Sequence, residues 1–189
     1  IRIPSAHNAL VGLRGTRGLS SRDGIIPLSH TQDIGGPLAR TVSDLVAVLD
    51  VTVGLDPADD STQLSEGRIP DSYADALIDD ALRGARLGVL TELVGEAAAD
   101  RPVRDVIEAA IEEMRNEGAE TVDLSETGLP ALLEGAGLRE FKFDLADYLS
   151  QTPGAPVRSL DEIVNRGLYH EALERGNRTS IDVETLDTD

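Results

Sequence analysis

The chain has 189 residues, of which 40% are hydrophobic, and it carries a formal net charge of −18. This length fits one ordinary domain or most of one, with enough apolar side chains for a single core. The absence of cysteine excludes disulfides and thiolate metal sites, and no apolar run is long enough to cross a bilayer. An acidic surface repels nucleic acid and anionic membranes, so we expect neither as a partner.

The acidic residues, 35 against 17 lysines and arginines, are spread along the chain rather than gathered in a tail, and Lys142 is the only lysine. An ordinary well-solvated surface is one interpretation, but acid excess with almost no lysine resembles proteins of salt-loving archaea. We therefore expect adaptation to high salt, where ions screen the repulsion among like charges. No basic stretch followed by an apolar one marks a signal peptide, and we expect a cytoplasmic location.

Residues 1–54 begin with an irregular, glycine-rich stretch and end with a helix. The pattern from Val11 to Leu13 predicts a short strand within that stretch. Thr41 is placed to cap the helix, with Asp44 three residues later, and apolar residues follow at helical spacing. Gly54 is placed to end it.

Residues 84–125 give the clearest pattern, which is strand, helix, strand. A buried strand is predicted from Ala85 to Leu90, a helix opens at Asp100 and Pro102, and a second strand runs from Ala119 to Leu124. The apolar face of that helix consists of Val103, Val106, Ile107, Ala110, Ile111 and Met114. A βαβ unit of these lengths predicts parallel strands and therefore an α/β fold.

Two other segments are less regular. Residues 55–82 form a long connection, with a short helix expected around Tyr73 to Leu82. Residues 130–189 are mainly helical, with helices predicted at 130–150 and from Ser159 or Asp161 to Arg166. This last segment ends without a recognisable stop signal, so we expect it to be incomplete at the C-terminus.

A series of short motifs occupies the first 42 residues. They read Ile1-Arg2-Ile3-Pro4, Gly12-Leu13-Arg14, Gly18-Leu19, Ser21-Arg22-Asp23-Gly24-Ile25-Ile26-Pro27, His30-Thr31-Gln32-Asp33 and Gly36-Pro37-Leu38-Ala39-Arg40-Thr41-Val42. In this order and spacing the chain closely resembles the amidase-signature family just past its nucleophile. The signature of that family ends in serine, an aliphatic residue, arginine, any residue and proline. Ile1, Arg2 and Pro4 match it, so the nucleophilic serine would immediately precede Ile1.

The resemblance continues with falling specificity towards the C-terminus. The matching stretches are Asp56-Pro57-Ala58-Asp59, the segment from Leu82 to Leu90, the segment from Phe141 to Leu149, and Pro156-Val157-Arg158-Ser159-Leu160. Nothing from about Gly176 onward identifies the family. The resemblance implies that residues 1–189 are a partial amidase-signature domain, in which helices flank both faces of a mixed β-sheet.

The resemblance also implies a chemistry. Enzymes of this family cleave carboxamide bonds with a serine nucleophile, a second serine held in a cis peptide, and a neutral lysine as the base. All three would lie upstream of Ile1, so we expect this chain alone to be inactive. A chain that starts beside the nucleophile would expose strand edges and apolar faces, so we also expect it to be poorly stable, especially at low salt. The resemblance implies a small-molecule amide as substrate of the full-length protein and no cofactor or metal. A homo-oligomer is compatible with the sequence.

Several residues within the chain are candidates for supporting roles. The resemblance places Arg2, His30, Gln32 and Asp33 beside the active site, as residues near the substrate or behind the catalytic groups. Ser29, His30 and Asp33 contain the residue types of a hydrolytic triad, but such close neighbours rarely converge with triad geometry, so a structural role is favoured. Lys142 is expected in a surface or packing role.

The smaller motifs do not suggest further chemistry. Ser20-Ser21 is expected to form part of a turn, because it lacks the flanking glycines of the family's cis-serine motif. His7 and His170 have no partner at ligand spacing, and no metal site is expected.

Two alternative functions remain open. One is the A subunit of the amidotransferase that amidates misacylated tRNA, a branch that usually reads Ser-Leu-Asp-Gln where this chain has His30-Thr31-Gln32-Asp33. This departure favours a free-standing amidase. The other is a non-catalytic binding or scaffold protein that kept the fold and lost the catalytic residues.

Overall fold

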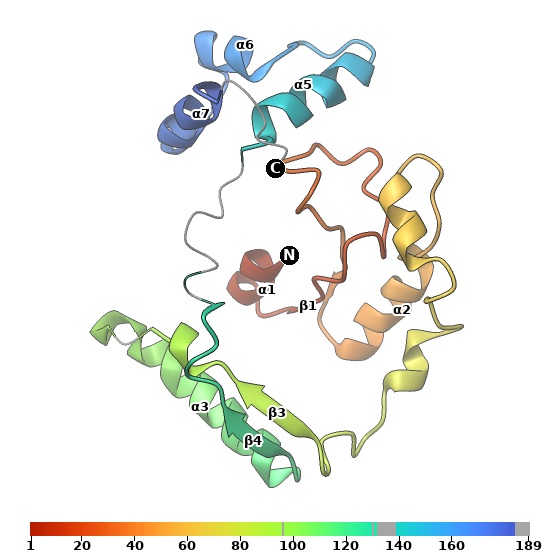
Figure 1. The fold of residues 1–189 in the computed structure, drawn as a ribbon, viewed down its shortest axis with the longest axis vertical. Helices are drawn as coiled ribbons and strands as arrows, with labels where there is room; N and C mark the ends of the chain where they lie inside the picture. The colour runs from red at the N-terminus through yellow and green to blue at the C-terminus, as the bar shows by residue number, and fades with distance from the viewer. Residues whose placement is uncertain (96, 130, 132–138, 184–189) are drawn as a thin grey trace. The chain divides into compact units, whose positions relative to one another are not determined.

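A computed structural model of the chain describes residues 1–95, 97–129, 131 and 139–183 (Figure 1). The chain divides into two compact units, which are described in turn. The first consists of Ile1–Ala74 together with Gly137–Asp189, and the second of Asp75–Ala136. No helix within the described ranges is both long enough and apolar enough to span a membrane.

The first unit starts with helix α1 (Arg2–His7), which lies against a small antiparallel ladder. Strands β1 (Val11–Gly12) and β2 (Leu38–Ala39) pair with Val11 opposite Ala39. The side chain of Ser5 is buried and donates to Ile1 O at 2.8 Å, and a Cβ on Gly12 would lie 2.0 Å from Ser5 Oγ. The helix therefore approaches the strand at a distance that only glycine permits. The short strand predicted around Val11 is confirmed, whereas α1 falls in a stretch expected to be irregular.

Helix α2 (Val42–Thr52) follows the second strand. The Asp44 N–H donates to Thr41 Oγ1 at 3.0 Å, so the predicted N-cap is confirmed. Leu45, Val46 and Leu49 form its buried face. Gly54 N donates to Leu19 O at 3.2 Å just past the end of the helix, which fits the predicted termination there.

The connection from residue 55 onward contains two short 3₁₀ helices, η1 (Asp60–Ser65) and η2 (Tyr73–Ala76). The helix predicted from Tyr73 to Leu82 is therefore wrong beyond its first turn. Asp50 explains where that turn starts, because its carboxylate accepts from Ser72 Oγ at 2.6 Å and from Tyr73 N at 2.7 Å. After Ala76 the backbone continues in turns, such as the bond from Ala81 N to Ile78 O at 3.2 Å.

The C-terminal part of the first unit is helical and carries a small apolar core. It contains α5 (Phe141–Gln151), α6 (Leu160–Asn165), the 3₁₀ turn η5 (Glu171–Leu173) and α7 (Glu174–Ile181). Leu145, Leu149 and Leu160 are buried together. The helix predicted from Ser159 or Asp161 to Arg166 is confirmed, and Ser159 caps it by accepting from Glu162 N at 3.1 Å. Residues 130 and 132–138 of the helix predicted at 130–150 lie outside the described residues.

Lys142 extends from α5 towards the end of α7. Its ammonium group donates to Ile181 O at 2.9 Å and to Val183 O at 3.4 Å. Ile181 is the last residue of α7 and Val183 lies two positions beyond it, where a carbonyl has no later helical turn to supply its donor. Lys142 thus has the packing role expected for it.

The second unit contains the predicted βαβ arrangement. Strands β3 (Arg86–Val89) and β4 (Glu120–Asp123) pair in parallel, and α3 (Arg101–Asn116) connects them. The 3₁₀ turns η3 (Thr91–Leu93) and η4 (Ala98–Asp100) precede α3. The element types and the parallel pairing are confirmed.

The expectation that the first of these strands is buried is wrong. Residues of β3 alternate between exposed and half-buried, and no residue of α3 is buried. Val103 and Val106 are 63% and 69% exposed. The physical reason is that one helix and two strands offer too little surface to cover both faces of the sheet and the whole apolar face of the helix.

Candidate functional site

A cavity of about 260 Å³ lies where the start of the chain meets the segment that precedes β2. Its lining consists of Ile1, Arg2, Ile3, Pro4, Arg14, Gln32, Asp33 and Ile34. We call it the N-terminal cavity. Three of the four residues predicted to lie near the active site, namely Arg2, Gln32 and Asp33, are thus brought together although they come from two separate motifs. His30 does not line this cavity.

Asp33 has a defined role in shaping the loop that lines the cavity. Its Oδ2 accepts from Leu28 N at 2.7 Å and from Ser29 N at 2.9 Å, while its own N–H donates to Ser29 O at 2.8 Å. Gln32 N also donates to Ser29 Oγ, at 3.2 Å. These bonds close a tight turn, as aspartate side chains commonly do. They leave the side chain of Gln32 at the cavity wall.

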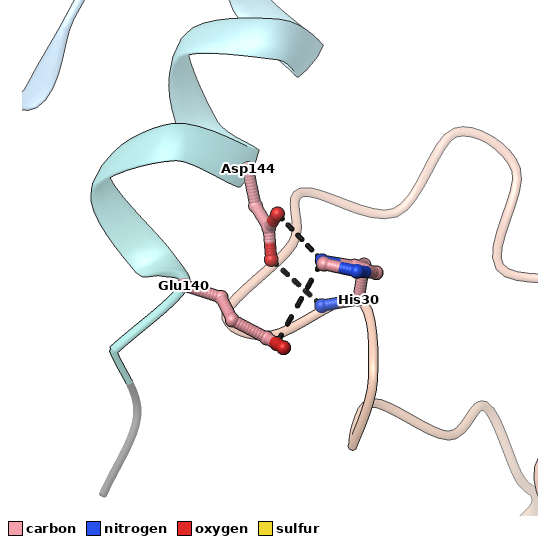
Figure 2. A group of neighbouring side chains, drawn as sticks. All are labelled: His30, Glu140 and Asp144. Carbon is pink, nitrogen blue, oxygen red and sulfur yellow. Dashed lines mark hydrogen bonds and ion pairs between the residues drawn. The ribbon is translucent and has the colours of Figure 1, made fainter. Parts of the chain in front are cut away.

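His30 points the other way, towards the first turn of α5 (Figure 2). Its N–H donates to Asp144 Oδ2 at 2.7 Å, and its Nδ1 lies 2.8 Å from Asp144 Oδ1 and 3.7 Å from Glu140 Oε2. The imidazole is 58% exposed, whereas both carboxylates are largely buried. Glu140 and Asp144 were not predicted, because both lie more than a hundred positions from His30 and no local pattern relates them.

Ser29 completes this group beside the imidazole. It is fully buried, and its hydroxyl donates to Glu140 Oε2, which also accepts from Thr31 N at 3.2 Å. Burial raises the pKa of the Glu140 carboxyl, but the hydrogen bonds from Ser29 and Thr31 outweigh it and hold the pKa below its usual range. Glu140 therefore stays ionised in this setting.

Ser29, His30 and Asp33 do not form a catalytic triad. The Ser29 hydroxyl bonds to Glu140, the imidazole bonds to Asp144, and Asp33 bonds to backbone N–H groups. A triad needs the base to receive the serine proton and the acid to orient the base. The expectation that these close neighbours do not converge with triad geometry is confirmed.

The group of His30, Glu140 and Asp144 contains residue types that bind divalent cations. One ligand atom from each lies within 4.8 Å of the others. Both oxygens of Asp144 and Oε2 of Glu140 already accept hydrogen bonds from the loop. A cation would have to displace these bonds, so the geometry describes a hydrogen-bonded network rather than a preformed metal centre.

A larger cavity of about 1210 Å³ shares Arg14, Gln32 and Ile34 with the N-terminal cavity. Apolar side chains such as Leu49 and Tyr73 form much of its wall. Three arginines line it, namely Arg14, Arg17 and Arg68, and none of its described lining residues is acidic. In a chain with a net charge of −18, this is a local concentration of positive charge.

The chain is similar in sequence to known proteins of one family. A family model described as Amidase matches residues 1–179. A probable amidase from Arabidopsis thaliana is 34% identical over 170 residues, which is 85% of this chain and 31% of that protein. The A subunit of a glutamyl-tRNA(Gln) amidotransferase from a Synechococcus strain is 40% identical over 160 residues, which is 85% of this chain and 28% of that protein.

Solved structures show the same relationship in three dimensions. The native peptide amidase from Stenotrophomonas maltophilia superposes with a TM-score of 0.82 at 36% identity, over 100% of this chain and 40% of that one. An amidase family protein from Bacillus anthracis gives a TM-score of 0.74 at 29% identity, over 97% of this chain and 37% of that one. The chain belongs to the Amidase family and has its α/β fold. It spans between 28% and 40% of the length of these relatives.

Proposed function

We propose that the protein to which these residues belong hydrolyses a carboxamide C–N bond, giving a carboxylic acid and ammonia or an amine. One observation carries the proposal beyond family membership. Arg2, from the end of the signature motif, lines the N-terminal cavity together with Gln32 and Asp33. A carboxamide presents a carbonyl oxygen that accepts hydrogen bonds and an amide N–H that donates them. Arg2 offers donors, Asp33 offers acceptors and Gln32 offers both.

In this proposal the chain supplies the surroundings of the reacting group rather than its nucleophile. The family resemblance puts the serine nucleophile next to Ile1 and assigns the second serine and the base lysine to other segments. Lys142 is not a substitute base, since its ammonium donates to two carbonyls at the end of α7. We propose that Arg2, Gln32 and Asp33 orient the substrate, and that His30 supports the loop from behind.

We also propose that residues 1–189 are part of one amidase-signature domain. Residues 1–54 would contribute the end of the signature region and its helix. Residues 84–125 would contribute the βαβ unit, and residues 130–189 a mainly helical segment. The parallel pairing of β3 with β4 and the superposition on a longer peptide amidase support this proposal.

Ammonia release from a panel of carboxamides tests the proposed activity. The assay is run in high salt on the 189-residue chain and on the product of the complete open reading frame that contains it. We expect activity only where the serine and lysine of the family are present. Arg2→Ala should lower kcat/KM of the active protein by roughly tenfold or more, whereas Arg40→Ala, at a position beyond the cavity, should leave it unchanged. No ammonia release from any carboxamide by either protein would contradict the proposal.

A role as the A subunit of a glutamyl-tRNA(Gln) amidotransferase is the second candidate, because a relative at 40% identity carries that name. The motif at His30–Asp33 departs from the one usual in that branch. Glutamine-dependent amide transfer, measured with the partner subunits present, separates the two candidates. A non-catalytic scaffold would show neither reaction.

The charge of the protein supports a proposal about its surroundings. We propose a cytoplasmic protein adapted to high salt, since its 35 acidic residues are dispersed and lysine is nearly absent. We propose that it has no nucleic-acid partner, because the same charge would repel a polyanion. Its association with further copies of itself is a question for sedimentation measurements at high salt.

A further inference from the structure

The loop of residues 28–33 is bound by charged side chains along both edges of its backbone. On the N–H edge, three carboxylates accept hydrogen bonds from the backbone. Asp33 accepts from Leu28 N and Ser29 N, Asp144 accepts from His30 N, and Glu140 accepts from Thr31 N. Four consecutive N–H groups are therefore held by negative charge, and two of the three carboxylates come from the start of α5 (Figure 2).

On the carbonyl edge, three arginines donate to three successive oxygens. Arg22 donates to His30 O, Arg17 Nη1 to Thr31 O at 3.3 Å, and Arg14 Nη2 to Gln32 O at 3.1 Å. Backbone groups of an ordinary loop bond to water or to neutral partners. Here the same six-residue loop has cations on one edge and anions on the other.

Charged partners make these bonds stronger than neutral ones. A hydrogen bond with one ionised member is roughly twice as strong as a neutral one. The loop has no strand or helix of its own in which to satisfy these groups. Its conformation therefore depends on Asp33 within the loop and on side chains from elsewhere, of which Glu140 and Asp144 lie more than a hundred positions away.

The conformation of the loop determines which of its residues line the N-terminal cavity. Gln32 and Asp33 line the cavity, while His30 and Thr31 face α5. A shift of the loop would move both cavity residues together, because they follow His30 and Thr31 directly in the chain. Neither Glu140 nor Asp144 lines the cavity.

We propose that Glu140 and Asp144 are positioning residues, which hold the loop so that Gln32 and Asp33 present their polar groups to a carboxamide in the N-terminal cavity. This inference rests on the proposed function for the identity of the ligand. Small displacements of substrate-orienting groups cost large factors in rate, so the effect should appear in ligand binding and in kcat/KM rather than in stability alone.

Isosteric variants of the product of the complete open reading frame, kept in high salt, test the inference. Glu140→Gln and Asp144→Asn keep the side-chain shape and remove the charge, and Asp144→Ala removes the acceptors as well. Asp147→Asn is the matched control, since Asp147 lies on the same helix and is exposed there. Unchanged amide shifts outside residues 28–33 and the immediate neighbours of the substituted residue establish that each variant keeps the fold.

Two measurements are made on each variant by nuclear magnetic resonance. The first is hydrogen exchange of two backbone N–H groups. Exchange at His30 should become roughly tenfold faster when Asp144 is altered, and exchange at Thr31 when Glu140 is altered. The second is titration with benzamide, followed at Gln32 and Asp33. The dissociation constant should rise about tenfold in Glu140→Gln and Asp144→Asn and stay unchanged in Asp147→Asn.

Faster exchange with unaltered benzamide binding would overturn the inference, because the carboxylates would then only tie the loop to α5. The absence of any benzamide-dependent shift at Gln32 and Asp33 in the unmodified chain would overturn it as well. Ammonia release decides the proposed function separately. Binding that depends on Glu140 and Asp144, without hydrolysis in the complete gene product, would support the positioning role while contradicting the amidase activity.

Discussion

Asp59 accepts hydrogen bonds from the backbone and from the guanidinium group of the same residue, Arg22. Arg22 N and Nε lie 2.9 and 3.0 Å from Asp59 Oδ2, and Arg22 Nη2 lies 2.9 Å from Oδ1. Asp59 is only 8% exposed, and its Oδ1 also caps η1 by accepting from Ser61 N at 3.1 Å. The pair fastens the turn at residues 21–24 to the connection that begins at residue 55. A two-pronged arginine–carboxylate pair fixes direction as well as distance.

Removal of Arg22 should be costly, because it leaves a buried carboxylate without its cation. We expect Arg22→Ala to lower the free energy of unfolding by about 3 kcal/mol. Arg166→Ala is the control, since the Arg166–Glu162 pair at 2.8 Å is exposed on the surface and should cost less than about 1 kcal/mol. Urea unfolding in the same buffer measures both. Equal losses would mean that burial of Asp59 contributes nothing to the strength of its pair.

Acid should weaken the contacts of Asp59 and Glu140. The hydrogen bond from Arg22 lowers the pKa of Asp59 well below its usual range although burial opposes it, and the pKa of Glu140 is also lowered. A carboxyl whose pKa is lower in the folded state stabilises the fold above its unfolded pKa, about 3.9 for Asp and 4.3 for Glu. That stabilisation is lost as the pH falls through the folded-state value.

The measurement is the difference in unfolding free energy between the unmodified chain and Asp59→Asn or Glu140→Gln, followed from pH 7 to pH 2. We expect each difference to be constant down to about pH 5 and then to shrink. Comparison by difference cancels the change in overall charge repulsion, which affects both proteins alike. A difference that stays constant through the acid range would show that the two carboxyls have unshifted pKa values.

Local signals in the sequence predicted the elements that the chain forms by itself. Thr41 with Asp44 is a capping pair whose members lie three residues apart, and that helix starts where expected. The helix Leu160–Asn165 starts just after Ser159, one of the two starts expected for it. The strands Arg86–Val89 and Glu120–Asp123 follow from apolar runs on either side of an amphipathic helix. In each case the sequence pattern that predicts the element lies within one helical turn or one strand.

Features that depend on distant residues were not predictable in the same way. The burial expected for the strand at Arg86–Val89 was wrong, because burial depends on what covers the sheet and not on the strand itself. The contact of His30 with Asp144 joins positions 114 apart, and no periodic pattern links them. The motif containing Gln32 and Asp33 placed both residues near Arg2 only through the family resemblance.

Two glycines with similar backbone geometry should respond differently to substitution. Gly18 and Gly24 have φ values of 84° and 75°, a region that alanine adopts with strain. A Cβ on Gly18 would lie 2.1 Å from Ser61 O, whereas a Cβ on Gly24 would meet nothing within 4 Å. Gly24→Ala should therefore cost about 1 kcal/mol and Gly18→Ala about 3 kcal/mol. Thermal or urea unfolding compares them, and similar losses would contradict the close approach of residues 18 and 61.

Salt should stabilise this chain, and the size of the effect tests whether its acidic composition is an adaptation to high salt. A net charge of −18 repels itself at low ionic strength. The screening length falls from about 10 Å at 0.1 M salt to about 3 Å at 1 M. If screening relieves about 2 kcal/mol of repulsion, the Tm of a protein of this size should rise by about 5 °C between these concentrations of KCl.

Sucrose at equal osmolality supplies the control, because it stabilises folded proteins by exclusion from their surface without screening charge. The cost of Arg22→Ala should be nearly the same at both salt concentrations, since buried pairs are screened much less than exposed charges. A Tm that stays level or falls as KCl increases would contradict the proposed adaptation to high salt. In that case the acidic residues would be an ordinary solvated surface, whose mutual repulsion is already weak at their actual spacing.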